Sequence, residues 1–250
     1  MKIDRFQAAL TAVPTLLVAL AWGPSIVTAS QTAPVTTAGT PAPRLPSGKP
    51  DLSGVWMPPY VPDMTKSGRG QQGQAELPFT PTGLKDWTTY DAVNGDYTGS
   101  CLPFGLTRSF NAPYPFQIMQ SDTQIAVLFE IMTWHHVISL NPPGATVAEP
   151  TWFGHSTGQW DGDTLVVHTT GFNGYTRLDT VGHPHSDALH VTQTFRRTDA
   201  EHMAYTVTID DPKTYTRPWK NQRTITLLKG PLIEYSCEEN NKSLWDGHFK

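Results

Sequence analysis

The sequence predicts a mainly β protein whose strands form an antiparallel up-and-down barrel of about eight strands, with one short N-terminal helix. Three observations support this prediction. Short segments alternate between apolar and polar residues, tight-turn residues separate them, and helical periodicity is almost absent after residue 115. A barrel is favoured because closure removes the unpaired edges that such a meander leaves exposed. A β-sandwich is the alternative.

The first 50 residues are expected to lie outside this fold. Residues 1–29 have a charged start, an apolar run broken by Pro14 and small residues near the end, which is the pattern of a secretory signal peptide. The uninterrupted apolar part is shorter than the ~20 residues of a membrane span, so a cleaved leader is favoured over an anchor. Residues 30–50 are rich in Pro and Thr and predict an extended linker. A single domain at 51–250 follows.

The composition of the chain indicates which kinds of partner and which cellular compartment to expect. The net charge is −4, only 16% of the residues are charged and no basic run occurs, so nucleic acid is not an expected partner. No stable membrane span is expected once the leader is removed. The chain is expected to be exported to the periplasm or out of the cell. Because these compartments are oxidising, the two cysteines of the chain, Cys101 and Cys237, are expected to form a disulfide. Two buried free thiols are the alternative.

The strands and the helix expected near the two ends of the domain sequence are short. Residues 55–56 suit a strand that two following prolines end. Residues 80–93 are the best helix candidate in the chain. Residues 223–228 and 233–236 predict the last strands.

Residues 124–140 predict a hairpin. The segments 124–131 and 134–140 both alternate between apolar and polar residues, and only two residues separate them. This register sets Phe129 opposite His136. It also keeps apolar residues together on one face, which supports the pairing.

Two further hairpins bring polar residues together. An Asp-Gly pair at 161–162 lies between alternating runs, which is the strongest short-range hairpin signal. Counting back from this turn sets His155 opposite His168. On the next pair of strands, a three-residue loop sets His190 opposite Asp210.

Several motifs resemble a family of exported bacterial proteins, most of them uncharacterised. The motifs are PDLSGVW, CLPFG, NAPYPFQI, GQWDGDTLVVHTTGF, GHPHSDALHV and TIDDPKTYTRPW, and the resemblance covers nearly all of residues 50–240. It implies export and a lipocalin-like or calycin-like barrel, and it implies no particular reaction. At position 168 this sequence has His where many relatives are expected to have Asp.

The densest group of candidate catalytic residues lies around the motif GHPHSDALHV. His190 is suited to proton transfer near neutral pH, and the carboxylate of Asp210 across the hairpin would fix its tautomer and stabilise its charged form. His185 and Asp187 precede this strand and are expected on a loop at the barrel mouth. His155 would supply a further titratable group.

Other interpretations of the same motif stay open. His183, His185 and His190 could bind a metal ion, but Pro184 between the first two argues against a regular strand, so no cofactor is expected. Ser186 lacks the Gly-x-Ser-x-Gly pattern of a hydrolase nucleophile. The motif also suits a solvated turn followed by a polar, outward-facing strand face.

A second group of residues suggests a ligand pocket. His136 shares a strand face with Trp134 and needs a hydrogen-bonding partner or a ligand if that face is buried. Tyr114 and Phe116 are candidates for the pocket wall. We therefore expect an exported, cofactor-independent enzyme that acts on a small apolar or aromatic molecule by His/Asp acid–base chemistry, as a lyase, isomerase or hydrolase. A non-catalytic barrel protein that binds a small molecule is the alternative.

Overall fold

The computed structural model describes residues 40–141, 149–239 and 241–242. The chain divides after Thr37, and all of the described residues belong to the second unit. The predicted signal peptide lies outside them, as does the first part of the predicted linker. The strands and helices, with the 3₁₀ turns η1 and η2, are β1 Gly54–Met57, β2 Gln71–Gln72, α1 Pro81–Thr89, η1 Tyr97–Ser100, α2 Leu106–Asn111, β3 Phe116–Gln120, β4 Gln124–Phe129, η2 Ile131–Thr133, β5 His135–Ser139, β6 His155–Asp161, β7 Thr164–Thr170, β8 His190–Arg197, β9 His202–Asp210 and β10 Trp219–Leu228.

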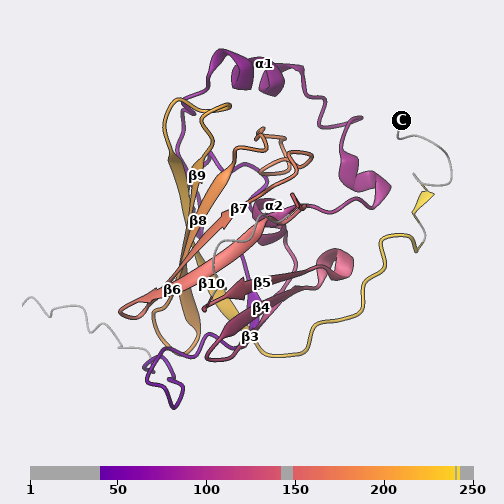
Figure 1. Ribbon diagram of the computed structural model, residues 1–250. Coiled ribbons are helices and arrows are strands. Elements are labelled where there is room, and N and C mark those ends of the chain that lie inside the picture. Colours follow the sequence, from indigo (N-terminus) through magenta and orange to yellow (C-terminus); the bar gives the residue numbers. More distant parts are fainter. Residues whose placement is uncertain (1–39, 142–148, 240, 243–250) are drawn as a thin grey trace, which may run out of the picture. The chain divides into compact units, whose positions relative to one another are not determined.

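Nine strands close into a barrel, which confirms the predicted fold class (Figure 1). Around the ring the order is β1, β3, β4, β5, β6, β7, β8, β9 and β10, and β1 pairs with β10 to close it, while β2 extends the β10 edge. All neighbours in the ring are antiparallel except β5 and β6, which run parallel. The barrel formed by the described residues is therefore mixed, and at least a dozen residues join its two parallel strands, as a parallel connection requires.

Aromatic side chains and helix α2 fill the barrel interior. All six residues of α2 are buried. The ring of Phe110 contacts those of Phe116, Phe129, Phe195 and Tyr205, with centroids 5.0–5.8 Å apart. The apolar space beside them leaves no volume that a water molecule could occupy. This part of the interior is a packed core.

A buried cation ties α2 to the barrel wall. Arg223 of β10 donates from Nη1 to the carbonyl of Phe110 at 3.1 Å and to Oδ1 of Asn111 at 2.5 Å. Its Nε donates to Asn221 at 3.0 Å, and the guanidinium lies 5.2 Å from the centroid of the Tyr205 ring. Burial lowers the pKa of Arg223 to about 10. The side chain stays charged at neutral pH because polar acceptors and an aromatic face replace water around it.

The hairpin at the Asp-Gly sequence has a register two residues away from the predicted one. Its two-residue loop is Gly162-Asp163, so His155 lies opposite Thr170. The predicted pairing of His155 with His168 is therefore wrong. Gly162 has a φ of 56°, and glycine takes the first loop position because a two-residue turn requires a positive φ there.

The β4–β5 connection is also longer than predicted. β4 ends at Phe129, and in the η2 turn that follows Met132 and Thr133 have positive φ angles. His136 consequently lies opposite Val127 instead of Phe129. Because the displacement is two residues, each side chain keeps the face that the alternation predicts.

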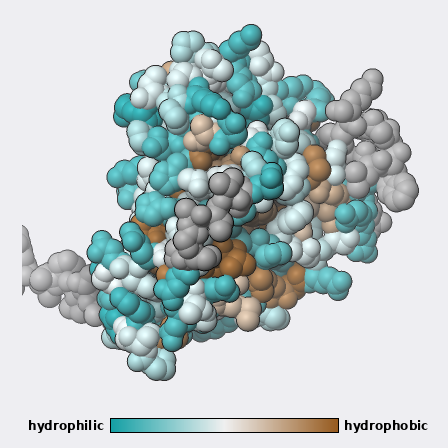
Figure 2. Space-filling model, in the orientation of Figure 1, coloured by the Kyte–Doolittle hydropathy of each residue, from teal (hydrophilic) through white to brown (hydrophobic). Residues whose placement is uncertain are grey.

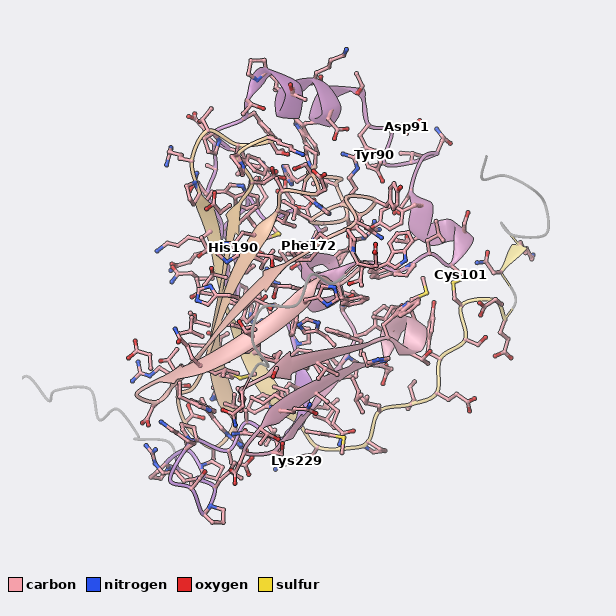
Figure 3. All side chains as sticks on the ribbon, in the orientation of Figure 1. Tyr90, Asp91, Cys101, Phe172, His190 and Lys229 are labelled. Carbon is pink, nitrogen blue, oxygen red and sulfur yellow. A yellow bond between two sulfur atoms is a disulfide. The ribbon has the colours of Figure 1, made fainter. Side chains whose placement is uncertain are left out.

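Three local predictions are confirmed. The helix expected within residues 80–93 is α1. The β8–β9 hairpin has the predicted register, with His190 opposite Asp210. Cys101 and Cys237 form the predicted disulfide, which joins the end of η1 to the C-terminal segment (Figure 3).

The segments before β1 and after β10 both form hydrogen bonds with the connections between strands. Within residues 40–50 of the predicted linker, Arg44 donates two hydrogen bonds of 2.9 and 2.6 Å to Asp163 in the β6–β7 turn. The strand predicted at 233–236 does not form, and at its start a backbone N–H donates to Glu130 at 2.9 Å. Among residues 40–141, 149–239 and 241–242, no helix has the length and apolar character of a membrane span.

Candidate functional site

A cleft of about 420 Å³ opens beside the parallel strands β5 and β6. The two strands pair at only two positions, so the start of β5 and the segment before β6 diverge. One wall comes from residues 134–137 and 139, and the other from residues 151–156. Figure 2 shows brown, hydrophobic residues on the part of this face where Figure 1 draws β4 and β5. We call this site the β5–β6 cleft.

The floor of the β5–β6 cleft holds a hydroxyl–imidazole pair. The Oγ of Ser156 lies 2.9 Å from Nε2 of His136 and 2.6 Å from Oγ1 of Thr169. All three side chains are buried, and His136 is 3% exposed. One consistent arrangement has Thr169 donating to Ser156 and Ser156 donating to Nε2 of a neutral imidazole.

Burial determines the protonation state of His136. Burial, with a smaller contribution from the neighbouring His135, lowers the pKa of this imidazole to about 4. The ring is therefore neutral at neutral pH. Within the described part of the chain, no hydrogen bond is formed by the second ring nitrogen, Nδ1.

Two glycines allow the strands around this pair to approach closely. A Cβ on Gly158 would lie 2.8 Å from the side chain of Ile138 and 2.9 Å from that of Leu140. Gly154 has a positive φ of 67°, and a Cβ there would lie 2.7 Å from the carbonyl oxygen of Thr170. Glycine at 158 thus lets β5 lie against β6, which brings His136 to Ser156.

Aromatic rings form the walls above this floor. The ring of Phe153 lies 6.1 Å from that of Trp134 and 6.2 Å from the imidazole of His136. Trp152 contacts Tyr175 at 6.0 Å. The indole Nε1 of Trp134 is buried and has no hydrogen-bond partner among the described residues. The cleft therefore combines an apolar wall with one unused donor and a hydroxyl–imidazole floor.

The predicted ligand-binding residues divide between three places. Trp134 and His136 line the β5–β6 cleft. Phe116 instead packs in the barrel core. Tyr114 contacts Tyr235 at 6.1 Å and borders a separate cavity of about 420 Å³. Strand alternation identifies the inward face, but it does not distinguish a core position from a cleft position.

The two loop residues of the predicted catalytic set, His185 and Asp187, each form hydrogen bonds with neighbouring groups. His185 is buried, with Nε2 2.6 Å from the hydroxyl of Thr176 and Nδ1 2.9 Å from the carbonyl of Ser186. Burial lowers the pKa of His185. Asp187 is exposed and accepts a hydrogen bond of 2.6 Å from Lys213. Both ring nitrogens of His185 are thus engaged within the loop, away from Asp187.

The strand residues of that set lie on the outer face of the barrel. His190, labelled in Figure 3, has its Nε2 3.3 Å from Nδ1 of His168 on β7. Asp210 is its cross-strand neighbour, but no hydrogen bond joins the two side chains within the described ranges. Of the predicted catalytic residues, only His155 lines the β5–β6 cleft, where its Nε2 lies 2.7 Å from the carbonyl of Glu149. The predicted set does not converge on one site.

The three histidines considered as metal ligands also lie apart from one another. His183 is buried, and its Nδ1 lies 2.6 Å from Oδ2 of Asp179. Asp179 also accepts from the backbone of Met64 at 2.8 Å. Among the described residues, the side chains that could together bind a metal ion are His183, Asp179 and Asp63, whose ligand atoms lie within 4.8 Å of one another. The hydrogen bonds of Asp179 give this group a role in joining two loops.

Sequence reasoning missed Ser156, although a signal was present. Residues 154–158 read Gly-His-Ser-Thr-Gly and match the Gly-x-Ser-x-Gly pattern that Ser186 lacks. Ser186 itself donates from Oγ to Asp211 at 2.8 Å, which holds its loop. The match at Ser156 lies inside strand β6 and not at a strand-to-helix turn, so the pattern alone would not have established a function.

Comparison with known proteins adds no functional assignment. No family model, no curated protein and no solved structure matches the chain. The β5–β6 cleft is the candidate site because a cavity, aromatic walls and a buried polar pair occur together there.

Proposed function

We propose that this protein binds a small, largely apolar or aromatic molecule in the β5–β6 cleft. The observation that supports this role is the cleft's combination of aromatic walls with a buried Ser156–His136 floor. Its volume of about 420 Å³ lies within the range of small-molecule sites, which are mostly apolar with a few placed polar groups. The packed core is consistent with this location, because side chains fill space that could hold a ligand in other barrels.

Other hollows lack this combination. One of about 330 Å³ lies over β2, β9 and β10 and is bordered mainly by Gly, Gln and Thr residues. Another, of about 450 Å³, adjoins the disulfide and shares Trp134 and His135 with the β5–β6 cleft. Neither of these two is lined by Ser156 or His136.

The cleft favours a ligand with a flat apolar body and one polar group. An aromatic ring against Trp134 or Phe153 gains about 0.5–1.5 kcal/mol beyond the burial of its area. A polar group at the floor can hydrogen-bond the Ser156 hydroxyl, a neutral contact worth about 1 kcal/mol. A formal charge there is disfavoured, because the neutral His136 and its buried neighbours provide no counter-ion.

Calorimetric titration with 2-naphthol tests this role. We expect saturable binding with a dissociation constant on the order of 1 mM or tighter. Val137→Trp should weaken binding at least tenfold, because position 137 lines the cleft and is 45% exposed, so the larger ring occupies the cleft without disturbing the core. Met119→Trp is the matched control, because Met119 is 54% exposed on β3 and away from the cleft. The proposal fails if 2-naphthol does not bind saturably, or if both variants bind it equally well.

We further propose that the protein acts outside the cytoplasm. The Cys101–Cys237 disulfide supports this location, because such bonds persist in oxidising compartments. Export through the predicted leader would yield a mature chain that begins at Ser30. Intact mass of the protein recovered from the periplasm or medium tests it, and an uncleaved chain in the cytoplasm would contradict it.

A further inference from the structure

Ser156 combines features that a ligand-binding floor alone does not require. Its hydroxyl contacts an imidazole nitrogen at 2.9 Å, and it borders an open cleft while remaining 8% exposed. Its sequence context is Gly154-His155-Ser156-Thr157-Gly158. A hydroxyl becomes a useful nucleophile when an adjacent base can take its proton.

His136 is placed to act as that base. Its Nε2 is the ring nitrogen that faces the hydroxyl. The ring is neutral at neutral pH because burial lowers its pKa, so Nε2 is free to accept a proton. Thr169, 2.6 Å from the same oxygen, fixes the direction in which the Ser156 hydroxyl donates.

We propose that Ser156 is a nucleophile and that the β5–β6 cleft reacts with carboxylic esters that carry an aromatic group; this rests on the proposed ligand-binding function. Oγ forms a bond to the ester carbonyl carbon while its proton passes to Nε2 of His136. The bond from that carbon to the leaving oxygen then breaks, and the proton on Nε2 passes to this oxygen to release the alcohol. Water cleaves the acyl–Ser156 ester in the same way and restores the hydroxyl.

The wall of the cleft offers a donor for the developing negative charge. The Nε1–H of Trp134 is buried and has no partner among the described residues. Trp134 and Ser156 line the same cleft. As part of this proposal, the Nε1–H donates to the oxyanion that forms on the ester carbonyl, because it has no competing partner among the described residues. Trp134→Phe keeps the ring and removes this N–H.

The dyad differs from a hydrolase triad in two respects that lower the expected rate. The lowered pKa of His136 makes it a weaker base. No carboxylate bonds Nδ1 of His136 within the described residues. In a serine protease the loss of the proper carboxylate contact lowers kcat by about 10⁴. We therefore expect single acylation events to be detectable and turnover to be slow, so covalent labelling is the appropriate measurement.

The experiment incubates the purified full chain with a fluorophosphonate that carries an aryl group and maps the modified peptide by mass spectrometry. We expect one adduct, on Ser156, and none on Ser156→Ala. His136→Gln should slow labelling at least 100-fold while circular dichroism reports an unchanged fold. Trp134→Phe should slow labelling about tenfold or more at a saturating concentration of the probe, because it removes the indole N–H and keeps an aromatic ring. Thr157→Ala is the matched control, because Thr157 is the exposed neighbour on β6, and it should label at the wild-type rate.

Experiments on the wild-type protein distinguish the proposed ligand binding from the proposed nucleophile. Saturating 2-naphthol should slow labelling of Ser156 at least fivefold, because both molecules occupy the β5–β6 cleft. If 2-naphthol binds and Ser156 is not labelled, the nucleophile is refuted and the binding function stands. If neither occurs, both are refuted. Labelling that 2-naphthol does not slow, or labelling elsewhere at an equal rate, also refutes a reactive serine in this cleft.

Discussion

The burial of His136 makes the stability of this protein depend on pH in a direction that can be calculated. The pKa of His136 is about 4 in the folded protein, against 6.5 for an exposed histidine. In the unfolded chain the ring takes up a proton as pH falls below about 6.5, whereas in the folded chain it stays neutral until about pH 4. Protonation therefore favours the unfolded state over this interval. The difference is worth about 3 kcal/mol in total, since each pH unit between the two pKa values corresponds to about 1.4 kcal/mol.

Urea unfolding of the wild type and of His136→Gln between pH 7.5 and 4.5 measures this effect. Glutamine does not titrate and can still contact Ser156, so other titrating groups, including the buried His185, cancel in the difference between the two proteins. We expect the stability of the wild type relative to the variant to fall by more than about 2 kcal/mol from pH 7 to pH 4.5. A difference constant within about 0.5 kcal/mol would show that the imidazole is not held neutral by burial.

Three further substitutions test the elements that support the site, each by urea denaturation at pH 7. Replacing Cys101 and Cys237 together by Ala should lower the free energy of unfolding by up to about 5 kcal/mol, because the bridge joins residues 136 positions apart; a loss below about 1 kcal/mol would contradict the loop-closure reasoning. Arg223→Met should cost about 3 kcal/mol, because it leaves buried acceptors of α2 unpaired, and an unchanged midpoint would mean that the cavity relaxes around the variant. Asp211→Asn should cost about 2 kcal/mol, because the buried carboxylate accepts from two loops, and the wild-type stability would show that those contacts are dispensable.

The fold class was predictable because its signal is local and repeated. Alternation with a period of two marks each strand and its buried face, and turn residues mark the ends. For the β8–β9 hairpin this reasoning predicted the exact register, with His190 opposite Asp210 as in the structure. The same reasoning misplaced His155 relative to His168, because a displacement of two residues leaves every face unchanged and the alternation cannot detect it.

The candidate site was less predictable because its parts are distant in the sequence. His136 and Ser156 meet across the parallel strand pair β5 and β6, and this contact depends on the close approach that Gly158 allows. No local pattern distinguishes that contact from an ordinary core histidine. The loop histidines illustrate the converse, because His183 and His185 resemble a solvated cluster until Asp179 and Thr176 bury and bind them.

By itself, the sequence determined a mainly β barrel, its inward faces, one helix and one disulfide, because these follow from strand periodicity, turn chemistry and the pairing of two cysteines. The tertiary structure alone decided that α2 fills the barrel, that Arg223 holds it in place, and that the buried Ser156–His136 pair lies beside the β5–β6 cleft. These features depend on which distant surfaces meet in three dimensions. Packing and desolvation act there between residues that are far apart in the sequence, and strand periodicity carries no information about such contacts.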